Sequence, residues 1–201
     1  MNKDEIEAKF YLRDRPAYIA RLQAAGAVLE HPRMLEQNLR FDLPDGSLMA
    51  QKNVLRLRQD RAALLTFKGP TRPQQGVAVR TEIQFEVSDF SAARDLLEAL
   101  GYQVVVMYEK YREDYFLGEV LITVDEMPFG LFTELEGPSV EAVQEAARRL
   151  GLNWEARGAA GYLELFDRLK KARGLPLQHL SFAEVGGLGV HPEELGMIPA
   201  D

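Results

Sequence analysis

A regular alternation of polar and apolar residues begins near the start of the chain. In the segment Glu5-Ile6-Glu7-Ala8-Lys9-Phe10, every second residue is charged and the residues between are apolar. Because successive side chains of a strand point to opposite faces, this pattern predicts a strand with one charged face. Its two carboxylates, about 7 Å apart, would suit Mg²⁺ or Mn²⁺, and its lysine would suit a phosphate oxygen. Considered alone, the segment favours a simpler interpretation, in which the charged face of a half-exposed strand meets water.

The same period of two recurs along the chain and predicts about eight to ten strands, mostly antiparallel. Beyond the first, these cover residues 27–31, 34–43, 54–59, 63–68, 79–87, 102–117, 119–125 and 131–136. Helices are predicted where a capping Asp or Ser precedes an apolar helical period, or where a glycine ends one. They cover residues 14–26, 88–101, 139–150 and 161–173. The Gly-, Pro- and Gln-rich residues 69–77 predict a loop, and the chain from about residue 183 predicts a loosely ordered tail.

The charged residues of these strands collect on one face, while helices are expected to cover the apolar face. The charged set comprises Glu5, Glu7, Lys9, Arg40, Arg56, Arg58, Lys68, Arg80, Glu82, Glu86, Lys110, Arg112, Asp125, Glu134 and Glu136. So many charges on one face predict a concave, water-filled surface, and about eight strands are enough to close a barrel. A barrel with a charged interior must hold water, ions or a charged ligand instead of a packed core.

Composition narrows the class of protein. The chain has 201 residues, of which 46% are hydrophobic and 27% charged, and we predict one domain over residues 1–175 with a partly ordered extension over residues 176–201. The net charge of −7 argues against nucleic-acid and anionic-membrane partners. The lack of cysteine excludes disulfides and thiolate metal sites. Because no apolar run approaches the roughly 20 residues that span a bilayer and no signal-peptide pattern opens the chain, we expect a cytoplasmic protein.

The two signs of charge predict different ligands. Arginine offers a planar, permanently charged fork that matches phosphate, and many inward cations would repel one another without an anion such as a polyphosphate. The carboxylates would instead hold Mg²⁺ or Mn²⁺, which bridges them to phosphate oxygens. A triphosphate held in this way favours in-line attack on phosphorus by water or a hydroxyl group. Neither Gly69 nor Gly76 begins a Walker-type phosphate loop, so side chains would have to bind the phosphates.

Taken together, the motifs resemble those of the CYTH family, the triphosphate tunnel metalloenzymes. The matching segments, in chain order, are Glu5-x-Glu7-x-Lys9, Asn38-Leu39-Arg40-Phe41-Asp42, Leu55-Arg56-Leu57-Arg58, Phe67-Lys68, Arg80-x-Glu82, Lys110-x-Arg112, Asp125 and Glu134-x-Glu136. The resemblance covers roughly residues 1–170 and is specific as a set, although each motif alone is weak. It implies an α+β fold, a closed eight-stranded antiparallel β-barrel that forms a tunnel with a charged interior and flanking helices.

The resemblance also implies roles for individual residues. The ligands of Mg²⁺ or Mn²⁺ would be Glu5, Glu7, Glu134, Glu136 and Asp125. The triphosphate would be bound by Lys9, Arg40, Arg56, Arg58, Lys68, Arg80, Lys110 and Arg112. The catalytic residues would be Glu5, Lys9, Glu82 and Asp125, the last two through a second metal ion or the attacking water. Family members often carry a further glutamate after the RxE motif, whereas Gln84 stands here, which weakens a fully acidic second-metal site.

Three functions stay open from the sequence. The first is a metal-dependent triphosphatase that acts on inorganic triphosphate, a nucleoside triphosphate or thiamine triphosphate. The second is a class IV adenylate cyclase, whose C-terminal segment resembles residues 161–165. The third is a module that binds polyphosphate without turnover, which would not need so many metal-binding carboxylates. We interpret the dispersed His31, His179 and His191 as structural or surface residues, and the apolar helix faces are compatible with a homodimer.

Overall fold

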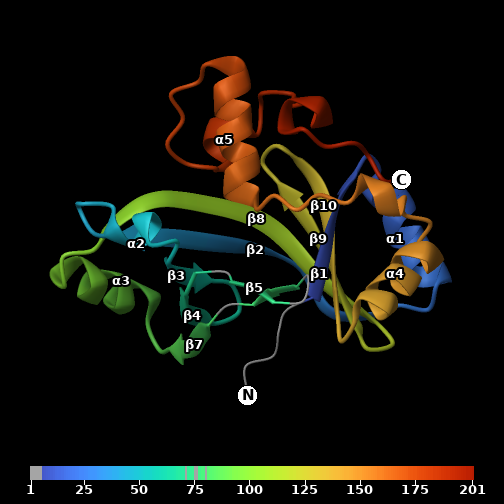
Figure 1. The fold of residues 1–201 in the computed structure, drawn as a ribbon, viewed down its shortest axis with the longest axis horizontal. Coiled ribbons are helices and arrows are strands. Elements are labelled where there is room, and N and C mark those ends of the chain that lie inside the picture. The colour runs from blue at the N-terminus through green and yellow to red at the C-terminus, as the bar shows by residue number, and fades with distance from the viewer. Residues whose placement is uncertain (1–5, 71, 75–76, 80) are drawn as a thin grey trace. The chain divides into compact units, whose positions relative to one another are not determined.

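The computed structural model describes residues 6–70, 72–74, 77–79 and 81–201, and its main feature is an eight-stranded antiparallel sheet with flanking helices (Figure 1). The strands are hydrogen-bonded in the order β1-β10-β9-β8-β2-β3-β4-β7. Among the described residues, no hydrogen-bonded ladder joins β7 to β1. The antiparallel α+β fold is therefore confirmed, while closure of the barrel stays a prediction. Glu5 and Arg80 lie outside the described residues.

Two predictions about the strands were wrong. The strands are β1 (Ile6–Leu12), β2 (Val28–Asp42), β3 (Val54–Gln59), β4 (Ala63–Lys68), β5 (Arg72–Gln74), β6 (Val77–Val79), β7 (Glu82–Val87), β8 (Gln103–Leu117), β9 (Val120–Met127) and β10 (Gly130–Gly137). Residues 27–31 and 34–43 do not form separate strands, because the fixed φ of Pro32 is compatible with the extended backbone of one continuous β2. The predicted loop at 69–77 contains most of the β5–β6 pair, in which Arg72 lies opposite Val79. Strands of three residues are too short to show an alternating pattern.

The helices begin and end largely where capping residues predict. They are α1 (Arg15–Ala24), α2 (Ser47–Ala50), α3 (Phe90–Ala99), α4 (Val140–Arg149), α5 (Tyr162–Arg173) and α6 (Phe182–Val185), with 3₁₀ helices η1 (Trp154–Ala156) and η2 (Pro192–Leu195). Asp14, Asp89 and Ser139 each accept a hydrogen bond from the backbone N–H three residues ahead, as N-caps do. Gly174 ends α5 with a left-handed φ of 63°. In the described part of the chain, none of the helices combines the length and apolar character that crossing a bilayer requires.

Asp42 explains the short helix α2, which the sequence does not predict. Its carboxylate accepts hydrogen bonds from the backbone N–H groups of Leu43, Leu48 and Met49, at 2.7, 2.9 and 3.0 Å. Burial would raise the pKa of Asp42, but these three donors lower it below its ordinary value. Asp42 therefore organises the chain between β2 and β3, which gives the last residue of the predicted aromatic-Asp motif a structural role.

The described chain divides into two compact units, to both of which β2 and β8 contribute residues. We call residues 6–34 and 110–201 the first unit, and residues 35–109 the second unit. In the first unit, α1 and α4 pack on one face of the strands, where Tyr18, Val143 and Leu150 join Phe10 in the core (Figure 1). Buried polar groups there are paired: the Tyr18 hydroxyl lies 3.0 Å from Oγ1 of Thr133. The opposite face of these strands is left for charged side chains.

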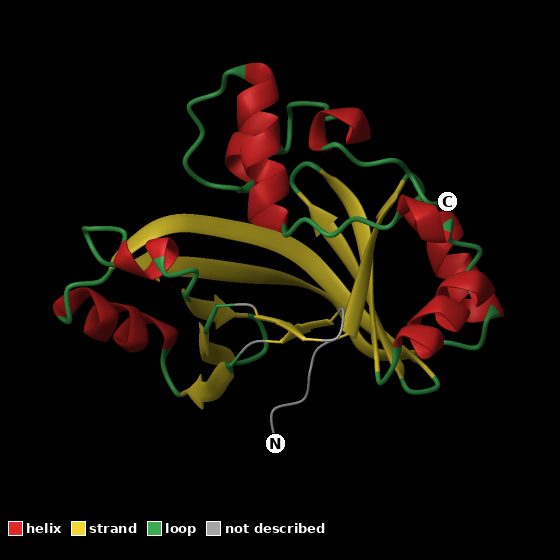
Figure 2. Ribbon diagram, viewed as in Figure 1, coloured by secondary structure: helices red, strands yellow, loops and turns green. Residues whose placement is uncertain are grey.

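In the second unit, α3 covers only part of the apolar face of the sheet (Figure 2). Leu97 of α3 packs with Phe41 and Leu57 in a small buried core. Ile83 and Phe85 of β7, by contrast, are 55% and 53% exposed. The expectation that helices cover the whole apolar face was therefore wrong at β7, because α3 is short and lies mainly against β3.

The segment after α5 packs on the first unit. Leu180, Val185 and Leu195 are buried, and the carboxylate of Asp201 accepts a hydrogen bond of 3.0 Å from the backbone N–H of Arg13. Several apolar residues of this segment are thus buried although their spacing follows no helical or strand period, whereas Ile198 is 56% exposed.

Candidate functional site

The charged face of the first unit carries a compact cluster of basic and acidic side chains. The strand register builds it, because Lys9 on β1 lies opposite Glu134 on β10, and Arg112 on β8 lies opposite Asp125 on β9. Lys110, two residues before Arg112, lies on the same face. The Lys9 ammonium is 3.2 Å from Oε1 of Glu134, and Nη2 of Arg112 is 2.7 Å from Oε2 of the same carboxylate. The structure therefore brings these five predicted site residues together.

Asp125 lies at the centre of this cluster and has no solvent exposure. Arg112 donates two hydrogen bonds to it, of 2.6 Å to Oδ1 and 2.5 Å to Oδ2, and the Lys110 ammonium donates a third, of 3.0 Å. Burial would raise the pKa of Asp125, but the two cations outweigh it and hold the pKa well below its ordinary value. The pKa of Glu134 is also lowered, because Arg112 and the two lysines outweigh burial. Both carboxylates are therefore ionised at neutral pH and neutralise the cations around them.

Tyr162 joins the cluster although the sequence gives no sign of it. The hydroxyl of this first residue of α5 donates a hydrogen bond of 2.8 Å to Oδ2 of Asp125. The ammonium groups of Lys9 and Lys110 lie 4.3 and 5.2 Å from the centre of its ring, and Phe132 packs edge-on against it. Burial raises the pKa of Tyr162 well above its ordinary value, so the hydroxyl keeps its proton. Only the tertiary fold identifies this residue, because tyrosine is ordinary at the start of a helix.

Carboxylates that could hold a metal ion gather beside the cluster. Glu7 lies opposite Glu136 in the β1–β10 register, and Glu134 is two residues from Glu136 on the same face. Within the described residues, no group of three or more histidine and acidic side chains is already arranged around a metal position. The donor chemistry of Glu7, Glu134 and Glu136 nevertheless fits a hard divalent cation. Asp125 and Glu134 are less available for this role, because cations contact both oxygens of each carboxylate: Arg112 and Lys110 at Asp125, and Lys9 and Arg112 at Glu134.

The charged face of the second unit is dominated by cations. Arg40 on β2 lies directly opposite Arg56 on β3, so the strand register places two cations next to each other. Nη1 of Arg56 lies 3.5 Å from the Tyr108 hydroxyl, while its Nε is buried and has no hydrogen-bond partner among the described residues. Burial lowers the pKa of Arg56, but Tyr108 and nearby carboxylates raise it more, so the guanidinium stays charged. A buried N–H without an acceptor costs about 1–3 kcal/mol, so an anion rich in acceptor oxygens would be favoured here.

Two further contacts involve residues that the motifs single out. The Lys68 ammonium lies 3.0 Å from Oε2 of Glu82, so this predicted lysine and this predicted acid are paired in the structure. Gln84, which departs from the family pattern, accepts a hydrogen bond of 2.9 Å from the Thr66 hydroxyl. The neutral amide is therefore paired with a neutral neighbour, and it adds no acidic ligand at this position.

Glu36 is a site neighbour that the sequence analysis missed, and it pairs with Asn38, the first residue of the predicted aromatic-Asp motif. Both are buried, and the Asn38 amide donates a hydrogen bond of 2.8 Å to Oε1 of Glu36. The other carboxylate oxygen of Glu36 lies 3.8 Å from the Arg58 guanidinium. The signal that could have found Glu36 is the period of two, since it precedes Arg40 at even spacing on the same strand.

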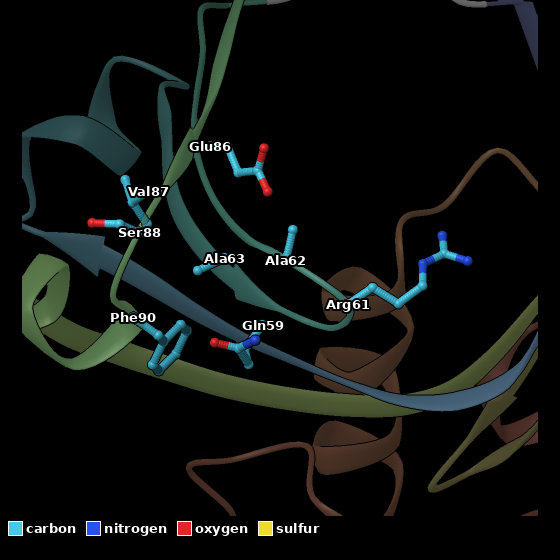
Figure 3. A pocket seen from close by; sticks show the side chains of 8 residues that line it. All are labelled: Gln59, Arg61, Ala62, Ala63, Glu86, Val87, Ser88 and Phe90. Carbon is cyan, nitrogen blue, oxygen red and sulfur yellow. The ribbon is translucent and has the colours of Figure 1, made fainter.

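A hollow of about 550 Å³ lies in the second unit, within the size range of small-molecule sites (Figure 3). Its lining comes from the β3–β4 turn, from β7 and from the residues that follow β7, and comprises Gln59, Arg61, Ala62, Ala63, Glu86, Val87, Ser88 and Phe90. In the strand register, Arg58 lies opposite Leu64, which lies opposite Glu86, so Glu86 shares the face of Arg58. The carboxylate, hydroxyl and aromatic ring of this lining offer hydrogen bonds and a stacking surface to a nucleoside, and the Arg61 guanidinium offers a cation to a phosphate.

A comparison of the chain with models of known families finds a match to the CYTH domain over residues 3–162. The chain belongs to the CYTH domain family. The family expected from the spacing of the motifs is thereby confirmed, and the match covers both units of this CYTH protein.

Relatives and solved structures agree with this assignment. Adenylate cyclase CyaB of Aeromonas hydrophila is 30% identical over 162 residues, which are 74% of this CYTH chain and 81% of the relative. A Vibrio parahaemolyticus structure, provisionally named an adenylate cyclase, has a TM-score of 0.72 at 22% identity and covers 83% of this chain and 99% of its own. A Hippeastrum protein, named a candidate adenylyl cyclase and described with a dominant triphosphatase activity, has a TM-score of 0.61 at 20% identity, with coverages of 87% and 99%. At these identities, the two structures establish a shared fold.

Proposed function

We propose that this CYTH protein is a Mg²⁺- or Mn²⁺-dependent triphosphatase that hydrolyses a triphosphate-containing substrate. The observation that carries the proposal is Arg56, whose buried Nε lacks a partner among the described residues and whose strand neighbour is the cation Arg40. A triphosphate would supply acceptor oxygens for this buried N–H and would interact favourably with both guanidinium groups. The triphosphatase activity described for the Hippeastrum protein of the same fold supports the reaction class.

In this proposal, the predicted cations bind phosphate oxygens. They are Lys9, Arg40, Arg56, Arg58, Lys68, Arg80, Lys110 and Arg112. Lys110 and Arg112 now pair with a carboxylate, and they would exchange that partner for the phosphates of the substrate. Glu82 and Asp125 would orient the water that attacks the terminal phosphorus. The bond from this phosphorus to its bridging oxygen then breaks, which releases orthophosphate and a diphosphate-containing product.

The metal ion would be held by Glu7, Glu134 and Glu136 together with Glu5. When bound, it would neutralise negative charge on the phosphoryl oxygens. Glu7 and Glu136 face one another across adjacent strands, so both can reach one ion from the same side. Glu7 and Glu136 would thus place two neighbouring carboxylates on the charged face of the sheet.

The test is a product assay on purified protein with tripolyphosphate or ATP and with Mg²⁺ or Mn²⁺, measuring orthophosphate, pyrophosphate and cyclic AMP. Glu5→Gln and Glu7→Gln are each expected to abolish turnover. The matched control is Glu145→Gln, which changes a half-exposed carboxylate on α4 and should leave turnover unchanged. Full activity in both site variants would refute the metal assignment. Tight tripolyphosphate binding without any product would instead favour a polyphosphate-binding module.

The second candidate function is adenylate cyclase, and the hollow beside Glu86 favours it. A cyclase must hold adenine and ribose so that the ribose 3′-hydroxyl attacks the α-phosphorus and displaces pyrophosphate. A hollow of about 550 Å³ on the same unit as the arginine pair could accept that nucleoside. Under this function, Glu86→Ala should raise KM for ATP severalfold and leave KM for tripolyphosphate unchanged. Cyclic AMP among the wild-type products would decide in favour of the cyclase.

A further inference from the structure

We propose that Tyr162 is a positioning residue, whose hydroxyl holds Asp125 in place while Lys110 and Arg112 turn to the phosphates of the substrate. The inference deepens the triphosphatase proposal and rests on it. It starts from the partners of Asp125, which differ in charge. Lys110 and Arg112 are cations that a triphosphate attracts, whereas Tyr162 donates through a neutral hydroxyl.

This difference matters once a phosphate chain competes for the cations. A triphosphate carries more charge than one carboxylate, so Lys110 and Arg112 have a reason to leave Asp125 when it binds. The Tyr162 hydroxyl is a neutral donor and gains little from a change of partner. The 2.8 Å hydrogen bond from Tyr162 is therefore the contact best suited to survive the exchange.

Tyr162 is also held firmly by the chain around it. The backbone N–H of Gly158 donates a hydrogen bond of 2.8 Å to the carbonyl oxygen of Lys9, and the Lys9 ammonium donates one of 3.2 Å to the carbonyl oxygen of Ala160. Beyond the tyrosine, Leu165 and Phe166 anchor α5 in the protein interior. Contacts on both sides thus fix Tyr162 relative to β1, which makes it a stable reference point for Asp125.

The consequence is an effect on the chemical step. A carboxylate that orients the attacking water must sit within a fraction of an ångström of its working position. If Tyr162 maintains that position only after the cations have moved, its loss should lower kcat and leave substrate binding nearly unchanged. A residue with a merely structural role would instead lower stability, or change KM and kcat together.

The experiment compares Tyr162→Phe with the matched control Tyr115→Phe. Each variant loses one buried hydroxyl that donates to a carboxylate, because the Tyr115 hydroxyl donates to Oε2 of Glu113 at 3.2 Å, but Tyr115 belongs to the apolar core of the first unit. With tripolyphosphate and Mg²⁺, Tyr162→Phe is expected to lower kcat about tenfold, as loss of a hydrogen bond to a charged group does, with KM changed less than about twofold. Tyr115→Phe should keep wild-type kcat and KM. Phenylalanine keeps the ring that packs on Phe132, so circular dichroism should show a folded protein.

Three results would overturn the inference: an unchanged kcat in Tyr162→Phe, a change in KM alone, or an equal loss of kcat in Tyr115→Phe. If the wild-type protein turns over neither tripolyphosphate nor ATP, the proposed function itself fails. Crystal structures of the wild type and Tyr162→Phe with tripolyphosphate bound, in which Lys110 and Arg112 contact the phosphates, then decide the positioning role separately. A displaced Asp125 carboxylate in the variant supports it, and an unmoved carboxylate refutes it.

Discussion

Replacing Asp125 with asparagine is expected to destabilise the folded protein by roughly 3–5 kcal/mol, the cost of removing one member of a buried ion pair. Asp125 is fully buried, and the side chains of its partners Lys110 and Arg112 are only 5% and 21% exposed. Asparagine preserves the size of the side chain but removes its charge. Two poorly hydrated cations would remain without a counter-charge, and the new amide group would direct its own donors toward the donors of Arg112.

Urea unfolding followed by circular dichroism measures this effect. The midpoint should fall while the slope stays constant, and the melting temperature should drop by roughly 6–20 °C. The matched control is Glu145→Gln, because Glu145 also pairs with an arginine, Arg148, but their side chains are 54% and 73% exposed. The control should change stability by less than about 0.5 kcal/mol. If Asp125→Asn is no less stable than this control, Asp125 does not balance buried charge in the way its contacts indicate.

Three further predictions concern other parts of the molecule. The hydrogen bond from Arg173 lowers the pKa of Glu194 to about 2, whereas the pKa of a glutamate in the unfolded chain is about 4.3. The ion pair therefore stabilises the folded protein fully above about pH 5 and progressively less below it. The melting temperatures of wild type and Glu194→Gln should converge as the pH falls toward 2. Tyr18→Phe removes the hydrogen bond to the Thr133 hydroxyl, which keeps its own bond to the carbonyl oxygen of Thr123, and should cost about 1 kcal/mol in urea unfolding. A loss above about 3 kcal/mol would point to a packing change. Arg56→Gln should raise KM for tripolyphosphate about tenfold with a smaller effect on kcat, and an unchanged KM would count against a phosphate contact.

The period of two in the sequence predicts which side chains share a face of the sheet, and the predicted shared face agrees with the structure for part of the site. Lys9, Lys110 and Asp125 were expected on one face, and the structure brings them together. Their partners depend on strand register, which a single sequence does not reveal. The resemblance to the CYTH family implied that Asp125 binds a metal ion, whereas in the structure it binds Lys110 and Arg112. Its metal role stays a prediction.

Residues that join the site from outside the alternating pattern could not be predicted. Tyr162 reaches Asp125 from the start of a helix, and only the folded chain shows that the two are neighbours. Short elements were missed for a related reason, since α2 depends on three backbone hydrogen bonds to Asp42 and not on a periodic pattern. We expected a helix to cover the apolar face of the sheet at Phe85, but this side chain is exposed. A sequence shows how long a helix is but not where it packs.

The position of Tyr162 has a practical consequence for recombinant fragments. The family match stops at residue 162, whereas α5 continues to Arg173. A protein shortened to the family boundary would keep the tyrosine but lose Leu165, Phe166 and Leu169, the buried residues that hold its helix. Such a fragment would retain every motif by which the family is recognised. Its Tyr162, however, would be held in place only by the residues that precede it in the chain. Expression trials should therefore carry the polypeptide well past Gly174, where the helix ends.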